Sequence, residues 1–461
     1  MKPSPPDGSI PPAGTGEDDG PANVAGLVGV VAAVLHTESH NALVIRAARV
    51  IDPALQRDEI ADVIVVDGRY AERASAAAHV LEGQGLIVCP GLMDIHVHLR
   101  EPGFEHKETI ESGTAAAAAG GFTFVACMPN TKPPLDNPKT VALVLEKARQ
   151  ADRCTVAPIA AITRGRRGVD LTHFAALREA GAVAFSDDGD GVQDTAVMRA
   201  AFQQATRTES TVIQHCQDNQ LAGKGVLHGG LVAAKLKLRG IDPAAEETML
   251  ERDLALCRET RARYHVAHVS TARAVDLIRK AKAEGLPVTA EVCTHHLALT
   301  DEACAGADPN TKMNPPLRPR ADVEACRRGL VDGTIDCIVT DHAPHSPAEK
   351  AVGFAAAPFG VIGLETALGV AAGALIQPGL TGWPTLIARF TVGPASVLHL
   401  PLPHIATGQP ANLTLINPAA PWTVDPLLFE SRSRNTPFAG WRLAGRPVCT
   451  LRGHRLTRPA W

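Results

Sequence analysis

The fold of this chain is decided at residues 91–103, which have the sequence GLMDIHVHLREPG. An apolar run at residues 86–89 leads into this stretch, so we predict a buried strand that ends in a polar loop. Side chains two residues apart on a strand point to the same side, and His96 and His98 can therefore aim two imidazoles at one transition metal. A chance histidine pair on an exposed strand is the alternative, but Arg100, a natural carboxylate anchor, follows at once and favours a functional site.

The composition is that of a large α/β protein. Of the 461 residues, 45% are hydrophobic and 4% aromatic, so the core must be packed mostly with Ala, Val, Leu and Ile. The 45 Lys and Arg residues against 49 Asp and Glu give a net charge of -4, which indicates no nucleic-acid or membrane partner. The ten cysteines are scattered without a CxxC pair, and several lie in apolar runs, which predicts a reducing, cytoplasmic location.

Both ends of the chain are predicted to lie outside the main domain. Residues 1–40 are expected to be a disordered extension, because they begin with a segment rich in Pro, Gly and Asp and contain an apolar run, 25–35, too short to span a bilayer. Residues 41–90 and 401–461 contain short strands, predicted at 42–46, 62–68, 411–416 and 440–455. We expect the two segments to form one small β-sandwich domain, because the termini of compact proteins often lie close together.

Residues 91–400 alternate apolar runs with helical segments. Eight strands are predicted, at residues 92–96, 123–128, 155–160, 182–186, 211–215, 264–268, 288–293 and 335–340. Helices are predicted between them, among them 109–119, 137–151, 171–180 and 243–261. This alternation indicates a (β/α)8 TIM barrel. A doubly wound sheet is the alternative, but no Gly-rich phosphate loop follows the first strand.

Polar residues follow the predicted strands at their carboxyl ends, where a TIM barrel carries its active site. They are His96, His98, Asn130, Asp187, Asp188, His215, His268, His295, His296, Asp341, His342 and His345. A random scatter of 18 histidines would not place so many at one end. Histidines and aspartates that converge on one barrel mouth suit a pair of divalent metals bridged by a carboxylate, with zinc favoured by these ligands.

Such a centre predicts hydrolysis, or its reverse, at an amide-like carbonyl. Two metals that share a hydroxide make a nucleophile at neutral pH, and one of them polarises the carbonyl. Asp341 can take the proton of that hydroxide and deliver it to a leaving nitrogen. Arg100 and Asn130 offer planar donors near the site, which indicates a substrate that bears a carboxylate.

Residues 41–461 resemble bacterial dihydroorotases of the larger type I form, within the cyclic amidohydrolase superfamily. The resemblance rests on six motifs, namely 94–103 (DIHVHLREPG), 128–131 (MPNT), 185–189 (FSDDG), 265–271 (HVAHVST), 312–318 (KMNPPLR) and 340–345 (TDHAPH). The first and last recur among related amidohydrolases, and their combination with 312–318 and the aspartate pair is more specific. The resemblance implies reversible ring closure of N-carbamoyl-L-aspartate to L-dihydroorotate, a step of pyrimidine synthesis.

The resemblance also implies the residues of the site. One zinc would be held by His96, His98 and Asp341, and the other by His215 and His268. Asp188 would bridge the two, although spacing alone does not separate it from Asp187. Asp341 would be the general acid and base, and the substrate would be bound by His98, Arg100, Asn130, Asn314 and His345, with backbone at Phe359 and Gly360. Gln217 stands where relatives commonly have Glu, and His295 and His296 are expected to support the mouth structurally.

Two other functions are open. A hydantoinase or allantoinase, which acts on another cyclic ureide, would usually carry a lysine for carboxylation at the end of the fourth strand, where residues 183–188 are VAFSDD. A non-catalytic scaffold for aspartate transcarbamoylase would have lost metal ligands, whereas this chain keeps all six. The sequence leaves open whether an active enzyme forms a homodimer or associates with the transcarbamoylase.

Overall fold

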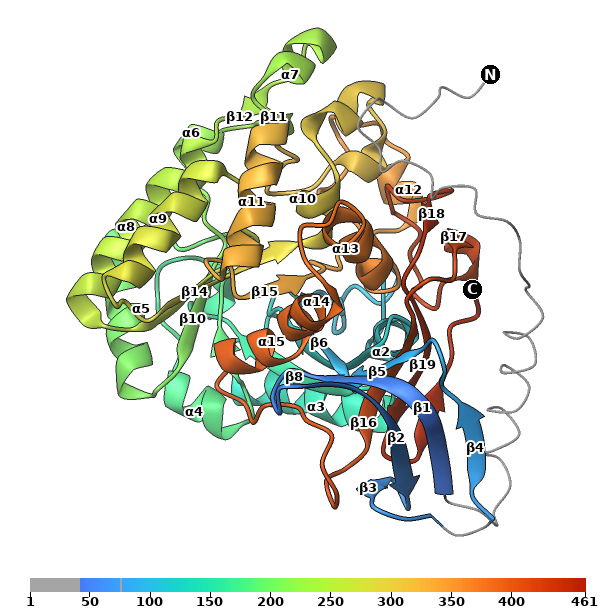
Figure 1. Ribbon diagram of the computed structural model, residues 1–461. Coiled ribbons are helices and arrows are strands. Elements are labelled where there is room, and N and C mark those ends of the chain that lie inside the picture. Colours follow the sequence, from blue (N-terminus) through green and yellow to red (C-terminus); the bar gives the residue numbers. More distant parts are fainter. Residues whose placement is uncertain (1–41, 75–76) are drawn as a thin grey trace.

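A computed structural model of the chain describes residues 42–74 and 77–461 (Figure 1). The disorder predicted for residues 1–40 therefore concerns a segment outside the described residues. Within the described ranges, no helix combines the length and the apolar character that a bilayer crossing requires.

The main sheet consists of eight parallel strands that follow one another in chain order. They are β6 (Leu92–Val97), β7 (Phe122–Cys127), β8 (Thr155–Ala160), β9 (Ala184–Phe185), β10 (Thr211–Gln214), β13 (Arg263–Val266), β14 (Val288–Cys293) and β15 (Cys337–Val339). A backbone bridge between Val97 and His342 and a hydrogen bond of 2.9 Å from His98 N to His342 O join the first strand to the chain that follows the eighth. The predicted (β/α)8 barrel is thereby confirmed.

Helices cover the outside of this barrel (Figure 1). They include α2 (Ile110–Ala119), α3 (Pro138–Ala151), α4 (Phe174–Glu179), α5 (Thr195–Arg207), α8 (Ala244–Thr260), α9 (Ala272–Ala283), α11 (Arg320–Asp332), α13 (Ala367–Leu375), α14 (Trp383–Phe390) and α15 (Val392–Val397). The predictions for α2 and α3 begin one residue early, because Thr109 and Asn137 are their N-caps. Asn137 Oδ1, for example, accepts hydrogen bonds from the amides of Lys139 and Thr140.

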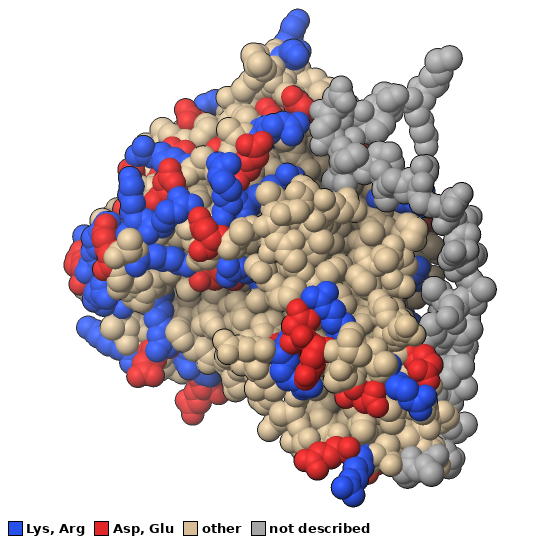
Figure 2. All heavy atoms as spheres, viewed as in Figure 1, with Lys and Arg blue, Asp and Glu red and all other residues tan. Residues whose placement is uncertain are grey.

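Further short elements lie in the loops of the chain. They are α6 (Asn219–Ala222), α7 (Leu231–Leu236), α10 (Thr294–Ala298), α12 (Pro347–Lys350), β11 (Leu227–His228), β12 (Gly240–Ile241), β17 (Trp422–Thr423) and β18 (Arg442–Leu443). On the face shown in Figure 2, Lys and Arg are interspersed with Asp and Glu over the outer helices at the left, and a broad uncharged area lies in the centre.

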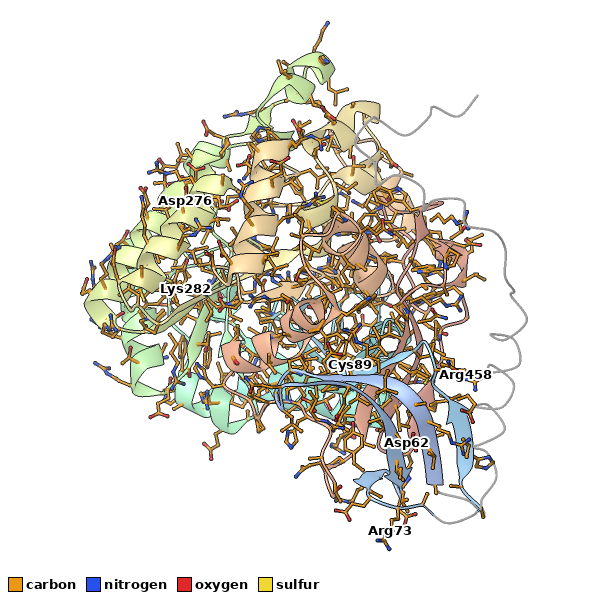
Figure 3. All side chains as sticks on the ribbon, in the orientation of Figure 1. Asp62, Arg73, Cys89, Asp276, Lys282 and Arg458 are labelled. Atoms are coloured by element: carbon orange, nitrogen blue, oxygen red, sulfur yellow. The ribbon has the colours of Figure 1, made fainter. Side chains whose placement is uncertain are left out.

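The two chain ends share a second sheet, as predicted. Its order is β20–β19–β16–β5–β1–β2–β3, with β4 beside β1. These strands are β1 (Ala42–Asp52), β2 (Arg57–Val66), β3 (Arg69–Ala71), β4 (His79–Glu82), β5 (Ile87–Pro90), β16 (Asn412–Asn417), β19 (Arg446–Arg452) and β20 (Arg455–Thr457). The antiparallel pair β5–β16 joins the two ends, and Cys89 lies buried in it (Figure 3).

A bulge in β1 shapes this second sheet. The register of β1 against β2 shifts between Ile45 and Ala48, where Ala47 has a φ of 53°. The carboxylate of Asp62 on β2 accepts a hydrogen bond of 2.9 Å from the Ala47 amide, so the bulged backbone group is satisfied (Figure 3). β5 leads directly into β6, which means that the second sheet fixes the start of the strand that carries His96.

Candidate metal centre

The six residues predicted to hold metal meet at the mouth of the barrel. They follow or end five strands at their carboxyl ends and are all buried, with exposed fractions of 0% for His96, 4% for His98, 4% for Asp188, 4% for His215, 2% for His268 and 7% for Asp341. Because parallel strands end at the same rim, residues far apart in sequence are brought together there.

The first half of the cluster contains His96, His98 and Asp341. His96 Nε2 lies 3.4 Å from Asp188 Oδ1, and His98 Nε2 lies 2.9 Å from Asp341 Oδ1. Two ligand atoms bound to one tetrahedral zinc, at about 2.0–2.1 Å each, are about 3.4 Å apart. The side chains are therefore spaced as ligands of one ion would be, with little rearrangement needed.

The second half contains His215 and His268. His215 Nδ1 and His268 Nε2 are 2.8 Å apart and lie 3.8 and 3.7 Å from Asp188 Oδ1. The other oxygen of Asp188, Oδ2, lies 3.7 Å from His98 Nε2. Asp188 thus faces both halves of the cluster at once, as a bridging carboxylate would.

The buried atoms of the cluster are short of hydrogen-bond partners. Among the described residues, His96 Nε2 and Asp188 Oδ1 have none, although both atoms are buried. Burial and the neighbouring His268 lower the pKa of His215 to about 3, so its ring is neutral and keeps a free lone pair at neutral pH. Burial opposes ionisation of Asp188, yet the nearby His96 and His268 imidazoles hold its pKa well below the usual value. Burial lowers the pKa of His96, but Glu291 and Asp188 together hold that pKa well above its usual value, so a divalent cation that binds His96 Nε2 must displace a proton from it.

The buried carboxylate of Glu291 on β14 holds His96 by a hydrogen bond. Its Oε1 accepts a hydrogen bond of 2.5 Å from His96 Nδ1, and its Oε2 accepts one of 3.0 Å from His265 Nε2. The contact keeps a proton on His96 Nδ1, so Nε2 is the nitrogen that a metal would take, and the carboxylate makes it a stronger ligand. We did not predict Glu291 from the sequence, although it is the single charged residue in the apolar strand 288–293, which is a usable signal.

Three non-glycine residues of the mouth have left-handed backbone conformations. They are Arg100, with a φ of 62°, His268, with 34°, and Asp341, with 46°. Such conformations cost free energy and persist only where the surroundings impose them. Asp94 helps to impose the last of them, because its carboxylate accepts hydrogen bonds from the Thr340 amide and hydroxyl and from the His96 amide.

Two of the residues predicted to bind substrate hold histidines of the cluster. Asn130 Oδ1 lies 2.8 Å from His98 Nδ1, and Asn314 Nδ2 lies 3.2 Å from His215 Nε2. Each amide therefore directs the opposite ring nitrogen toward the centre. Gln217 does not take part, since its side chain points to Asn219 instead.

Arg100 and His345 lie together on the next part of the rim. Arg100 is held by a hydrogen bond of 3.2 Å from its Nε to the Pro344 carbonyl, and burial lowers its pKa to about 10, so it remains a cation. His345 Nε2 lies 2.8 Å from the Phe359 carbonyl and donates to it. The Gly360 amide donates to the Lys312 carbonyl, so the predicted backbone segment is itself anchored to the protein.

Comparison with known proteins identifies the family of the chain. A family model described as dihydro-orotase-like matches residues 85–274. The dihydroorotase of Syntrophotalea carbinolica is 48% identical over 419 residues, which cover 90% of this chain and 98% of the relative. That of Pelotomaculum thermopropionicum is 49% identical over 418 residues, with the same two coverages of 90% and 98%. The chain belongs to the dihydroorotase family.

Solved structures agree on the fold. An L-hydantoinase from Arthrobacter aurescens superposes with a TM-score of 0.81 at 23% identity, over 91% of this chain and 96% of that one. A dihydropyrimidinase from Brevibacillus agri gives a TM-score of 0.79 at 21% identity, over 91% and 95% of the two chains. At this identity the likeness concerns the barrel and its attached sheet, whereas the family comes from the sequence relatives.

The structure separates the two adjacent aspartates of this dihydroorotase family member. Asp187 turns away from the mouth and accepts hydrogen bonds from the Ile162 and Thr163 amides and from the Thr163 hydroxyl. Asp188 faces the histidines instead. Of the two aspartates, Asp188 is therefore the one whose carboxylate is placed beside the histidines, and its bridging role stays a prediction.

Proposed function

We propose that this protein is a dihydroorotase, which closes N-carbamoyl-L-aspartate to L-dihydroorotate reversibly in pyrimidine synthesis. The observation that carries the proposal is the convergence of His96, His98, Asp188, His215, His268 and Asp341 at one barrel mouth in a chain about 48% identical to proteins named dihydroorotase. The absence of a lysine from residues 183–188 disfavours the hydantoinase alternative. The retention of all six residues disfavours the scaffold.

The proposed cofactor is a pair of zinc ions. His96, His98 and Asp341 would hold one ion, His215 and His268 the other, and Asp188 both. The unpartnered His96 Nε2 and Asp188 Oδ1, noted above for the described part of the chain, fit such a site. Bound there, the metals supply Lewis acidity and an activated water at neutral pH.

The protein's own groups then move the proton and hold the substrate. Asp341 is kept ionised, because the neighbouring His98 and His96 lower its pKa against the effect of burial. In hydrolysis it accepts a proton from the attacking water and gives it to the ring nitrogen as the C–N bond breaks, and in ring closure it works in reverse. Arg100 would present a cationic fork to the substrate carboxylate, with the Asn130 and Asn314 amides as further polar contacts.

The test is hydrolysis of L-dihydroorotate by the purified, zinc-loaded protein, followed by loss of ultraviolet absorbance. Turnover that a chelator abolishes and zinc restores is the expected result. Zinc-loaded protein that turns over a hydantoin but not dihydroorotate would overturn the substrate. Protein that binds no metal and turns over neither compound would favour the scaffold for aspartate transcarbamoylase.

The proposed location is the cytoplasm, because all ten cysteines are free and buried in the described ranges, as in proteins of reducing compartments. The small-molecule substrate is the partner that the proposal requires. A homodimer and a complex with the transcarbamoylase remain predictions, which sedimentation with and without the transcarbamoylase would test.

A further inference from the structure

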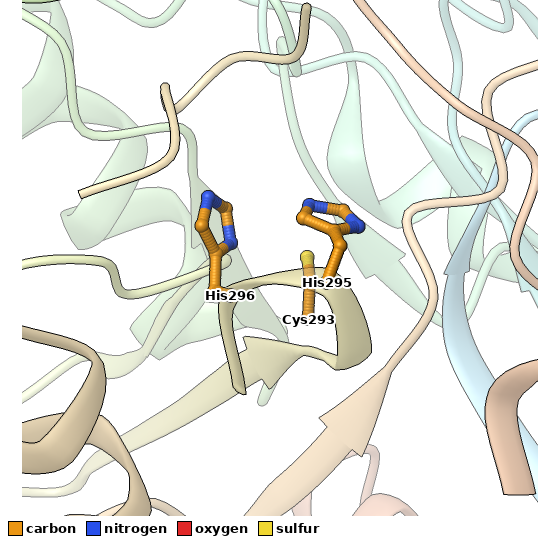
Figure 4. A group of neighbouring side chains, drawn as sticks. All are labelled: Cys293, His295 and His296. Atoms are coloured by element: carbon orange, nitrogen blue, oxygen red, sulfur yellow. The ribbon is translucent and has the colours of Figure 1, made fainter. Parts of the chain in front are cut away.

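A second group of ligand-type side chains lies beside the candidate metal centre. Cys293 is the last residue of β14, and His295 and His296 follow it in the first turn of α10 (Figure 4). The sulfur and one nitrogen from each ring lie within 4.8 Å of one another. All three residues are buried, with exposed fractions of 0%, 2% and 3%. None of them belongs to the six residues described above.

The two histidines of this group point free ring nitrogens into it. His296 Nε2 lies 3.0 Å from the Pro315 carbonyl and donates to it, which leaves Nδ1 as the nitrogen with the lone pair. In the described part of the chain, His296 Nδ1 and His295 Nε2 have no hydrogen-bond partner, although both are buried. A histidine held by a carbonyl on one nitrogen and bare on the other has the arrangement of a metal ligand.

We propose that Cys293, His295 and His296 form a third metal site, selective for a zinc-class divalent ion. One thiolate with two imidazoles is a ligand set that zinc and cobalt prefer and that magnesium and calcium do not. Binding replaces the thiol hydrogen with the metal, so one proton is released to solvent for each ion bound. The site goes beyond the proposed function, because it adds an ion that the six residues do not need.

The surroundings favour this group over a neighbouring one. His265, Glu291 and Cys337 also lie close enough together to share an ion. However, Glu291 already accepts hydrogen bonds from His265 Nε2 and His96 Nδ1, so its oxygens are occupied. In the Cys293 group, by contrast, one ring nitrogen of each histidine has no hydrogen-bond partner among the described residues.

Cobalt titration of the full-length, metal-stripped protein tests the site. A thiolate bound to Co2+ gives a near-ultraviolet charge-transfer band, and the six residues of the first centre contain no sulfur. We expect three equivalents of cobalt by metal analysis, with the band growing as one of them binds. Cys293→Ala should lose the band and one equivalent, and keep the other two.

Cys127→Ala is the matched control, because Cys127 also ends a barrel strand, β7, and is buried, at 3% exposure. It should keep both the band and the third equivalent. His295→Gln, which keeps the thiol, is the second variant in case Cys293→Ala does not fold, and it should weaken the third equivalent at least tenfold.

Two results would overturn the proposal. One is binding of only two equivalents with no thiolate band, and the other is a band that survives Cys293→Ala and disappears in Cys337→Ala. Because metal is counted without turnover, neither result depends on whether dihydroorotate is the substrate.

Discussion

His96 Nδ1 donates a hydrogen bond of 2.5 Å to Glu291 Oε1, and this contact joins β6 to β14 across strands that are not neighbours in the sheet. The same carboxylate accepts hydrogen bonds from His265 Nε2 and from the His268 amide. One buried anion thus orients the His96 ring in the first half of the candidate metal centre and holds the backbone of His268 in the second. Its pKa is held low, against the effect of burial, by His96 and His265.

Replacing Glu291 with Gln should therefore weaken metal binding. The substitution keeps the size of the side chain and removes its charge, so His96 loses the partner that makes it a strong ligand. We expect zinc affinity to fall by about 10- to 100-fold, measured by competition with a chelating dye. Asp253→Asn, which alters another fully buried carboxylate on α8, should leave the affinity unchanged. Equal affinities for the wild type and Glu291→Gln would contradict the orienting role.

Asp341→Asn should preserve the fold and remove proton transfer. Asn tolerates the left-handed conformation that Asp341 adopts, with its φ of 46°, so the backbone can remain in place. We expect kcat to fall by about 100- to 10,000-fold, measured in both directions of the reaction. Metal content is measured in parallel, so that loss of an ion is distinguished from loss of the acid and base. Near-wild-type turnover would remove Asp341 from the mechanism.

Arg100→Lys should act mainly on substrate binding. Lysine keeps the charge but cannot present two parallel donors to a carboxylate, so the Michaelis constant should rise by about tenfold or more while kcat changes less. Arg327→Lys is a suitable control, because Arg327 is also partly buried and binds a carbonyl, that of Leu297, outside the mouth. If the Michaelis constant of Arg100→Lys equals that of the wild type, the anchoring role is wrong.

The barrel and the rim positions could be predicted because they depend on local patterns. Seven of the eight predicted strands of residues 92–340 end in, or lead within two residues into, a polar residue, the exception being 155–160, and parallel strands place all such ends at one rim. The pattern alone therefore marked twelve residues at this rim, and the family resemblance selected the six metal ligands among them. Their partition between two ions depended on the family resemblance.

Contacts between distant residues could not be predicted in the same way. His96 and Glu291 are 195 positions apart, and no periodicity relates them. Asp187 and Asp188 were separated only by the loop amides of Ile162 and Thr163, which reach Asp187. The hydrogen bonds between Asn130 and His98 and between Asn314 and His215 likewise depend on the final arrangement of loops that meet in space.

Replacement of Gly360 by Ala would add one methyl group to a tightly packed part of the rim. The φ of Gly360 is +119°, and a Cβ there would lie 2.7 Å from Ala343 Cβ and 3.4 Å from His345 Nε2. Gly353 has a comparable φ of +85°, but a Cβ there would meet nothing within 4 Å. Both substitutions to Ala therefore carry a backbone cost of about 1–2 kcal/mol, and only Gly360→Ala adds overpacking, at about 1–3 kcal/mol.

We therefore expect Gly360→Ala to lower the thermal midpoint more than Gly353→Ala does. It should also raise the Michaelis constant for dihydroorotate, because His345 and the Phe359 carbonyl that holds it must shift to make room. Gly353→Ala should leave the Michaelis constant unchanged. If the two variants change the thermal midpoint and the Michaelis constant equally, the rim beside His345 can shift to accommodate the methyl group. The close approach of Gly360 to Ala343 then does not position the substrate.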